Sequence, residues 1–80
     1  MPRFYFSLQN TRGIIEDDIG QDLPGLKDAR SEATESAREI LAENVRHASN
    51  APLIAVIIRN EEGQELTRIQ VKDLLPEPLK

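Results

Sequence analysis

The sequence predicts a small α+β domain, a two-layer ββαββ unit in which one helix packs on one face of an antiparallel sheet of about four strands. Three observations lead to this prediction. Residues 3–9 alternate between apolar and polar side chains, and residues 53–58 are apolar and rich in β-branched side chains; both patterns are typical of strands. Between them, over residues 26–48, apolar side chains recur every three or four positions, which is the spacing of an amphipathic helix.

The first predicted strand covers residues 3–9. Phe4, Phe6 and Leu8 fall on one face of this strand, and the residues between them, including Tyr5, fall on the other. The chain has only two phenylalanines, and both lie here. Large aromatic side chains contribute much of the apolar area in a small core, so we expect this strand to anchor the core.

Three turns share one pattern, with Asn or Asp in the first position and Gly in the fourth. They cover residues 10–13, 17–20 and 60–63. Asn and Asp side chains accept hydrogen bonds from backbone N–H groups further along such a turn, and glycine tolerates its closing conformation. The first turn predicts a β-hairpin whose second strand begins at Ile14 and Ile15, and the third joins the last two strands.

The predicted helix begins at Leu26, after a Leu-Pro-Gly segment, and stops before the Ser-Asn-Ala-Pro segment at residues 49–52. Its first half carries alanines on the apolar face, which let a helix lie close to a sheet. Its other face is charged, and we expect it to be solvated. The predicted inner stripe consists of Leu26, Ala29, Ala33, Ala37, Ile40, Leu41, Val45 and Ala48.

Two further strands are predicted after the helix, at residues 53–59 and 65–72, with Ile69 and Val71 directed inward. Eighty residues is the length of one domain, which we place at residues 1–75. The segment 76–80 contains two prolines and is expected to be a frayed tail.

Composition narrows the classes of function. The chain has no cysteine, which rules out disulfides and thiolate chemistry and is compatible with a reducing, cytoplasmic location. The net charge is −4 and the basic residues are scattered, so we expect neither nucleic acid nor an anionic membrane surface as a partner. The opening residues have too short an apolar run for a signal peptide.

No pattern of side chains predicts a catalytic, cofactor or metal site. The densest acidic cluster, Glu16, Asp17 and Asp18 with Asp22, lacks the alternating ligands of a calcium loop and is interpreted as a solvated turn. His47, the only histidine, lies where a helix C-terminus favours positive charge, and no nucleophile accompanies it. We therefore predict that the protein is not an enzyme and requires no cofactor.

The segment 53–58 is apolar on both of its faces, whereas one helix can cover only one face of the sheet. Large exposed apolar patches usually mark partner surfaces. We therefore predict an interaction surface of Tyr5, Ile54, Val56 and Ile58, or the alternate residues of that strand, through which the chain forms a homodimer or binds a partner protein. Alternatively the patch is small, or it is covered by the leucines near the C-terminus, Leu74, Leu75 and Leu79.

Two other functions remain open from the sequence. One is an acidic regulatory protein that binds a basic partner, of the toxin or nuclease type, through the glutamates of the helix, Glu32, Glu35, Glu39 and Glu43. The other is a weak binder of a metal ion or small ligand near the acids of the first hairpin, Asp17, Asp18 and Asp22.

Three segments carry a resemblance to a known family. They are the opening Met-Pro-Arg-Phe-Tyr-Phe, the segment 20–26 with Ala29 and Ala33 beyond it, and the turn at residues 60–63. Together they resemble the DUF6894 type of domain of unknown function, found mainly in small proteins of rhizobia and related α-proteobacteria. The resemblance covers nearly the whole chain and implies a stand-alone bacterial, cytoplasmic domain, with no known activity, substrate or catalytic residue.

Overall fold

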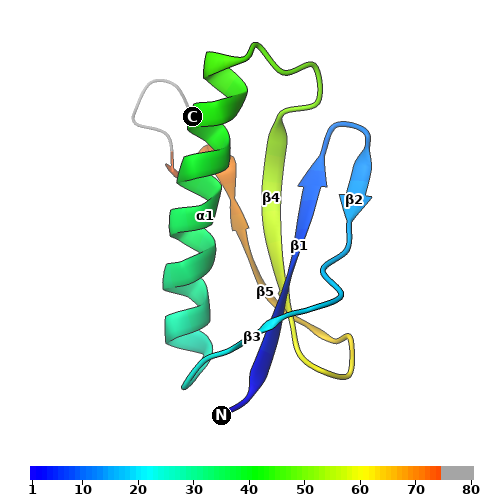
Figure 1. Cartoon of the computed structure of the whole chain (residues 1–80), viewed down its shortest axis with the longest axis vertical. Coiled ribbons are helices and arrows are strands. Elements are labelled where there is room, and N and C mark those ends of the chain that lie inside the picture. Colours follow the sequence, from blue (N-terminus) through cyan, green and yellow to red (C-terminus); the bar gives the residue numbers. More distant parts are fainter. Residues whose placement is uncertain (75–80) are drawn as a thin grey trace.

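The computed structural model describes residues 1–74 and contains one helix packed on an antiparallel sheet, which confirms the predicted fold class (Figure 1). The predicted tail, residues 76–80, lies outside the described residues, as does Leu75. The elements in chain order are β1 (Arg3–Asn10), β2 (Gly13–Ile15), β3 (Gln21–Asp22), α1 (Leu26–Arg46), β4 (Leu53–Arg59), β5 (Glu65–Gln70) and the 3-10 helix η1 (Val71–Leu74).

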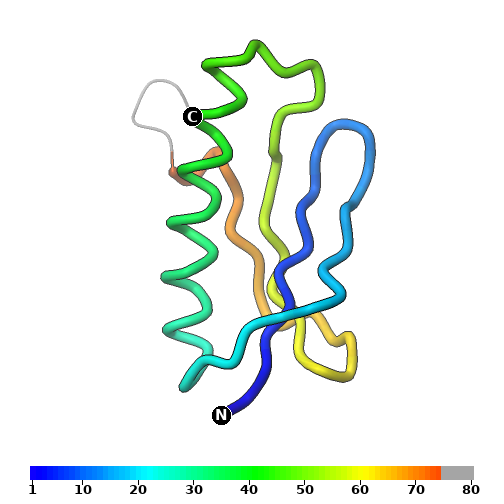
Figure 2. The backbone as a smooth tube through the Cα atoms, viewed as in Figure 1, coloured from blue at the N-terminus to red at the C-terminus, as the bar shows by residue number. Residues whose placement is uncertain are grey.

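The sheet has the strand order β2-β1-β4-β5, and β3 also pairs with β1. All four pairings are antiparallel. The two longest strands, β1 and β4, therefore lie at the centre, with Tyr5 opposite Arg59 and Ser7 opposite Ile57. β3 was not predicted, because only two residues, Gln21 and Asp22, return to pair with the start of β1 before the helix begins (Figure 2).

Alanines bring α1 close to the sheet. Ala29, Ala33 and Ala37 are all fully buried, and they form a cluster with apolar residues of β1, β4 and β5. Val45, predicted to be on the inner stripe, is instead 76% exposed. The reason is length, since 21 helical residues span about 32 Å whereas the seven residues of β4 span about 23 Å, so the helix outruns the strand that it covers.

β4 buries side chains on both of its faces. Leu53, Val56 and Ile58 belong to the cluster beneath α1. Ala55 and Ile57 are only 1% exposed, although neither belongs to that cluster. The register with β1 shifts between Gln9 and Asn10, where β4 passes from Ala55 to Leu53, and the residue between them, Ile54, is exposed. This irregularity interrupts the alternation of the strand.

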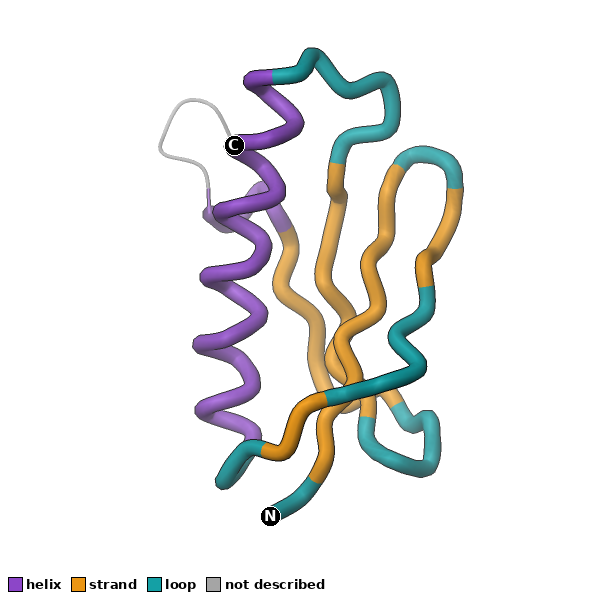
Figure 3. The backbone as a smooth tube through the Cα atoms, viewed as in Figure 1, coloured by secondary structure: helices purple, strands orange, loops and turns teal. Residues whose placement is uncertain are grey.

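The last strand is shorter than predicted. β5 ends at Gln70, and Val71 begins the short helix η1 rather than continuing the strand (Figure 3). Ile69 and Val71 are nonetheless buried, as predicted, because the turn into η1 keeps Val71 in the cluster beneath α1. Leu74 is partly buried against the same cluster.

The predicted turn chemistry is confirmed at both hairpins. Oδ1 of Asn10 accepts hydrogen bonds from the backbone N–H groups of Arg12 and Gly13. Oδ1 of Asn60 likewise accepts from two backbone N–H groups of its own turn, and Gly63 has the positive φ of +82° that favours glycine. These short-range bonds set the two hairpin registers.

Candidate functional site

The sheet face opposite α1 has no covering layer among residues 1–74, so it is the first place to look for a site. Its residues follow from strand alternation and from the register, because Val56, Ile58 and Ile69 face the helix. Its rows across the sheet are Tyr5 with Arg59, then Ser7 with Ile57 and Arg68, then Gln9 with Ala55 and Gln70.

The four residues predicted to form an interaction surface do not lie on one face of the sheet. Val56 and Ile58 are fully buried against the helix, so their assignment to the uncovered face was wrong. The register pairs them with Leu8 and Phe6 of β1, which pack against the same cluster beneath α1. Tyr5 does lie on the uncovered face, half-buried, and Ile54 is 42% exposed at the register irregularity.

Ile57 is buried on this face even though no helix covers it. It lies between Ser7 of β1 and Arg68 of β5. The guanidinium of Arg68 donates from Nη1 to Oε1 of Gln9 on β1, at 3.3 Å, so the arginine side chain crosses β4. Arg68 also donates twice to Glu65, at 3.0 and 2.9 Å. The apolar stem of an arginine can shield a neighbour while its charged end stays in water, which makes the face less apolar than predicted.

A small cavity of about 150 Å³ opens at one end of the same face. Ser7 is only 1% exposed, and its Oγ has no hydrogen-bond partner among residues 1–74. The Nε atom of Arg59 is also buried and also has no partner among these residues. Each unpaired buried polar atom costs about 1–3 kcal/mol of stability, so proteins rarely contain two of them in one place. The residues that line the cavity are Tyr5, Ser7, Glu16, Asp17, Arg59, Asn60, Glu61 and Gly63.

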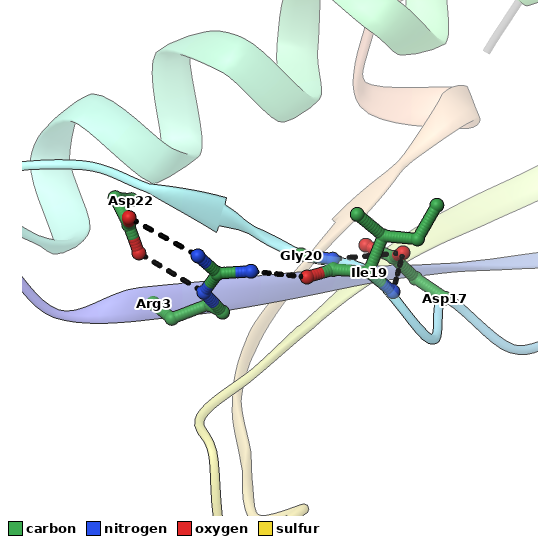
Figure 4. Close-up of polar contacts among 5 residues, drawn as sticks. All are labelled: Arg3, Asp17, Ile19, Gly20 and Asp22. Atoms are coloured by element: carbon green, nitrogen blue, oxygen red, sulfur yellow. Dashed lines mark hydrogen bonds and ion pairs between the residues drawn. The ribbon is translucent and has the colours of Figure 1, made fainter.

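The Asp17 carboxylate bonds to the edge of β1 where no strand pairs with it. Its Oδ2 accepts from the backbone N–H of Phe6 at 3.0 Å. Its Oδ1 accepts from those of Ile19 and Gly20 at 3.0 and 3.1 Å (Figure 4). Burial raises the pKa of Asp17, but the three hydrogen bonds together lower it by more than burial raises it. The pKa therefore lies below its ordinary value. Asp17 thereby fills the gap between β2 and β3 along β1.

An ion pair fastens β3 to the start of β1. Arg3 donates from Nε and Nη2 to the two oxygens of Asp22, at 3.0 and 3.1 Å, and from Nη1 to the carbonyl of Ile19 at 2.8 Å (Figure 4). Gly20 has a φ of +74°, and a Cβ on it would lie 2.9 Å from Cγ of Arg3 and from the carbonyl oxygen of Phe4. Only glycine fits this approach without displacing its neighbours.

Two of the four acids of the predicted cluster, Asp17 and Asp22, are therefore engaged in the fold, whereas Glu16 and Asp18 are exposed. Both oxygens of Asp17 accept backbone hydrogen bonds, and those of Asp22 accept from Arg3. Among residues 1–74, no group of three or more histidines and acids is arranged to hold a metal ion. His47 is the C-cap residue of α1, and its Nε2 lies 3.0 Å from a carboxylate oxygen of Glu43.

Two features of this region were not found from the sequence. The cavity at Ser7 and Arg59 joins residues of different hairpins, and no local pattern points to it. The Arg3–Asp22 pair spans 19 positions and depends on β3, which has no strand signal of its own. Asp17 did carry a signal, because it holds the first position of an Asp-x-x-Gly turn, but its bond to Phe6 requires the tertiary fold.

Comparison with known proteins gives one match. The family model of the DUF6894 domain of unknown function matches residues 3–72, which run from the first residue of β1 into η1 and so include every strand and the helix. No curated protein and no solved structure matches the chain. No helix within residues 1–74 is long and apolar enough to cross a membrane. Because the match covers most of its length, the chain belongs to the DUF6894 family of domains of unknown function.

Proposed function

We propose that the chain is a non-enzymatic protein-interaction module that forms a homodimer through the uncovered face of its sheet. The observation that supports this proposal is the placement of α1 and η1 in one apolar cluster on the same side of the sheet. The opposite face of β1 and β4 has no second layer within residues 1–74. A sheet face left open in this way is a common place for a second copy to pack.

Exposed apolar side chains at one end of the sheet favour this surface. Ile14, 49% exposed, lies opposite Gln9 in the β1–β2 pair and so shares its face. Ile54, 42% exposed, lies at the register irregularity directly before Ala55, which is opposite Gln9 on the other side. Exposed apolar side chains of this kind are what partner surfaces bury.

Charges of both signs accompany these apolar residues. Arg59 lies on the uncovered face, and Glu16 and Glu61 line the same cavity, whereas Arg68 is already paired with Glu65 of its own copy. In a two-fold dimer, each copy presents the same surface to the other. A mixed surface can then place the basic residues of one copy against the acids of the other, which favours one orientation.

Molar mass in solution tests this proposal. We expect the chain at about 100 μM, a concentration that populates dimers of micromolar affinity, to have twice its monomer mass by size exclusion with light scattering. Ile54→Lys should give the monomer mass, and Val45→Lys, the same change on the exposed end of α1, should not. Monomer mass for the unaltered chain would refute the proposal. Val56 is unsuitable for this test, because it is fully buried and a lysine there would unfold the domain.

The helix offers less support as a surface for a basic partner. Its glutamates alternate with Lys27, Arg30 and Arg38 along the exposed side, so the surface carries both charges. Glu43 is further engaged by Arg46 and His47 in the last turns. An acidic regulator needs a continuous field of one sign to attract its partner, and this surface does not provide one.

We further propose that the protein is bacterial and cytoplasmic. The family resemblance supports the bacterial source, and a sequence without cysteine has no requirement for an oxidising compartment. The net charge of −4 supports the view that neither nucleic acid nor an anionic membrane is its partner.

A further inference from the structure

Two buried polar atoms belong to residues that line the cavity on the uncovered face. Ser7 and Arg59 are diagonal neighbours across the β1–β4 pair, because Tyr5 lies opposite Arg59 and Ser7 lies opposite Ile57. Both residues line the cavity, and Oγ of Ser7 and Nε of Arg59 have no partner. Buried polar atoms nearly always find a partner, so this pair is the strongest sign of a ligand in the chain.

The two atoms determine which chemical group would satisfy them. The Nε–H of arginine is only a donor, and a serine hydroxyl can donate as well. One carboxylate can therefore accept a hydrogen bond from each, and the charge of Arg59 strengthens both bonds. The guanidinium donates only one long bond, 3.3 Å from Nη1 to the carbonyl of Gly63, so turning this side chain toward a ligand in the cavity gives up only a weak contact.

The rim of the cavity requires a second group of opposite charge. Glu16 and Glu61 line it and are both exposed. Asp17 lines it too, but its two oxygens already accept backbone hydrogen bonds. A simple anion would be repelled by this acidic rim, whereas a ligand that carries an ammonium group beside its carboxylate would be attracted by it.

We propose that this cavity binds a small free α-amino acid. The carboxylate of the ligand accepts from Nε of Arg59 and Oγ of Ser7, and its ammonium group lies against Glu16 and Glu61. A volume of about 150 Å³ corresponds to about five water molecules, which suits glycine, alanine or serine. The cavity lies on the face proposed for the dimer and shares Arg59, Glu16 and Glu61 with it, so the mass of each sample has to be measured beside glycine binding.

Titration of the isotope-labelled chain with glycine tests the inference by NMR, because the Nε–H of Arg59 has its own signal. We expect saturable shifts of that signal and of the backbone signals of Ser7 and Gly63, with a dissociation constant of about 1 mM or lower. Acetate and methylammonium, each carrying half of the ligand, should bind at least tenfold more weakly.

Two variants show whether the proposed atoms hold the ligand. Ser7→Ala removes the unpaired hydroxyl and should keep the fold, and Arg59→Lys keeps the charge but loses Nε. We expect each to weaken glycine binding at least fivefold. Arg68→Lys, the same change elsewhere on this face, should bind glycine as the unaltered chain does.

Several outcomes would overturn the inference. One is that no saturable shifts occur up to about 50 mM glycine, a concentration far above the expected dissociation constant. Another is that acetate binds as tightly as glycine. Unchanged affinity in Ser7→Ala would also overturn it. In that last case the two atoms serve only to hold a buried water. Molar mass measured on the same samples keeps this result separate from the test of the dimer.

Discussion

Replacing Asp17 with alanine should destabilise the domain far more than an ordinary substitution in a turn. The carboxylate accepts hydrogen bonds from the backbone N–H groups of Phe6, Ile19 and Gly20. The Phe6 group is partly buried, and leaving it unpaired costs about 1–3 kcal/mol. The other two lie in one turn, with the Ile19 group exposed and the Gly20 group partly buried, so we assign each about 0.5 kcal/mol, the lower end for a lost capping bond. The sum is about 2–4 kcal/mol, out of roughly 4–12 kcal/mol expected for a chain of this length.

Urea unfolding followed by circular dichroism measures this loss. Asp17→Asn keeps one carbonyl oxygen and should lose about half as much, because it can serve the turn but not Phe6 as well. Asp18→Ala is the matched control, an exposed aspartate in the same turn. A change of less than about 0.5 kcal/mol in Asp17→Ala, the range of ordinary surface substitutions, would refute the reasoning.

The same carboxylate makes stability depend on pH. Its pKa is lower in the folded chain than its ordinary value of 3.8, so the unfolded chain binds the proton more readily. The stabilisation is therefore fully present above pH 3.8 and is lost as the pH falls through the pKa of the folded state. We expect the fall in stability below about pH 4 to be shallower in Asp17→Asn than in the unaltered chain.

Three further changes test the packing. Gly20→Ala places a Cβ 2.9 Å from backbone and side-chain atoms at a positive φ, and should lower stability by about 2–4 kcal/mol in urea unfolding, whereas Gly25→Ala, which meets open space, should not. Ala33→Leu overfills the closest contact of α1 with the sheet and should cost about 1–3 kcal/mol by the same assay. Arg68→Ala uncovers Ile57 and should strengthen self-association in sedimentation equilibrium; unchanged association would contradict the shielding described for that arginine.

Local sequence patterns were sufficient to predict most of the fold. Alternation at residues 3–9 and the alanine stripe of α1 identified the two elements that meet in the core, and the Asn-x-x-Gly turns identified the hairpins. Each of these signals arises within a few residues. The prediction that Val45 is buried was wrong, because the exposure of that residue depends on the length of the sheet beneath the helix.

The direction of β4 could not be read from its sequence. Every residue of 53–58 is apolar, so the pattern fits either face equally well. The choice is made by the register with β1, which pairs Val56 with Leu8 on the helix side, and the shift near Asn10 leaves Ile54 exposed. The covering of Ile57 by Arg68 likewise depends on a contact across three strands. Long-range pairings of this kind have no local signature.

The most direct test of the uncovered face as the site of self-association is a dilution series by NMR. Between about 500 μM and 20 μM, a range that spans dissociation of a micromolar dimer, the backbone signals of Tyr5, Ile14 and Ile54 should shift with concentration, whereas those of Arg30 and Glu39 on α1 should not. Shifts confined to α1, or spectra that do not change at all, would contradict the account.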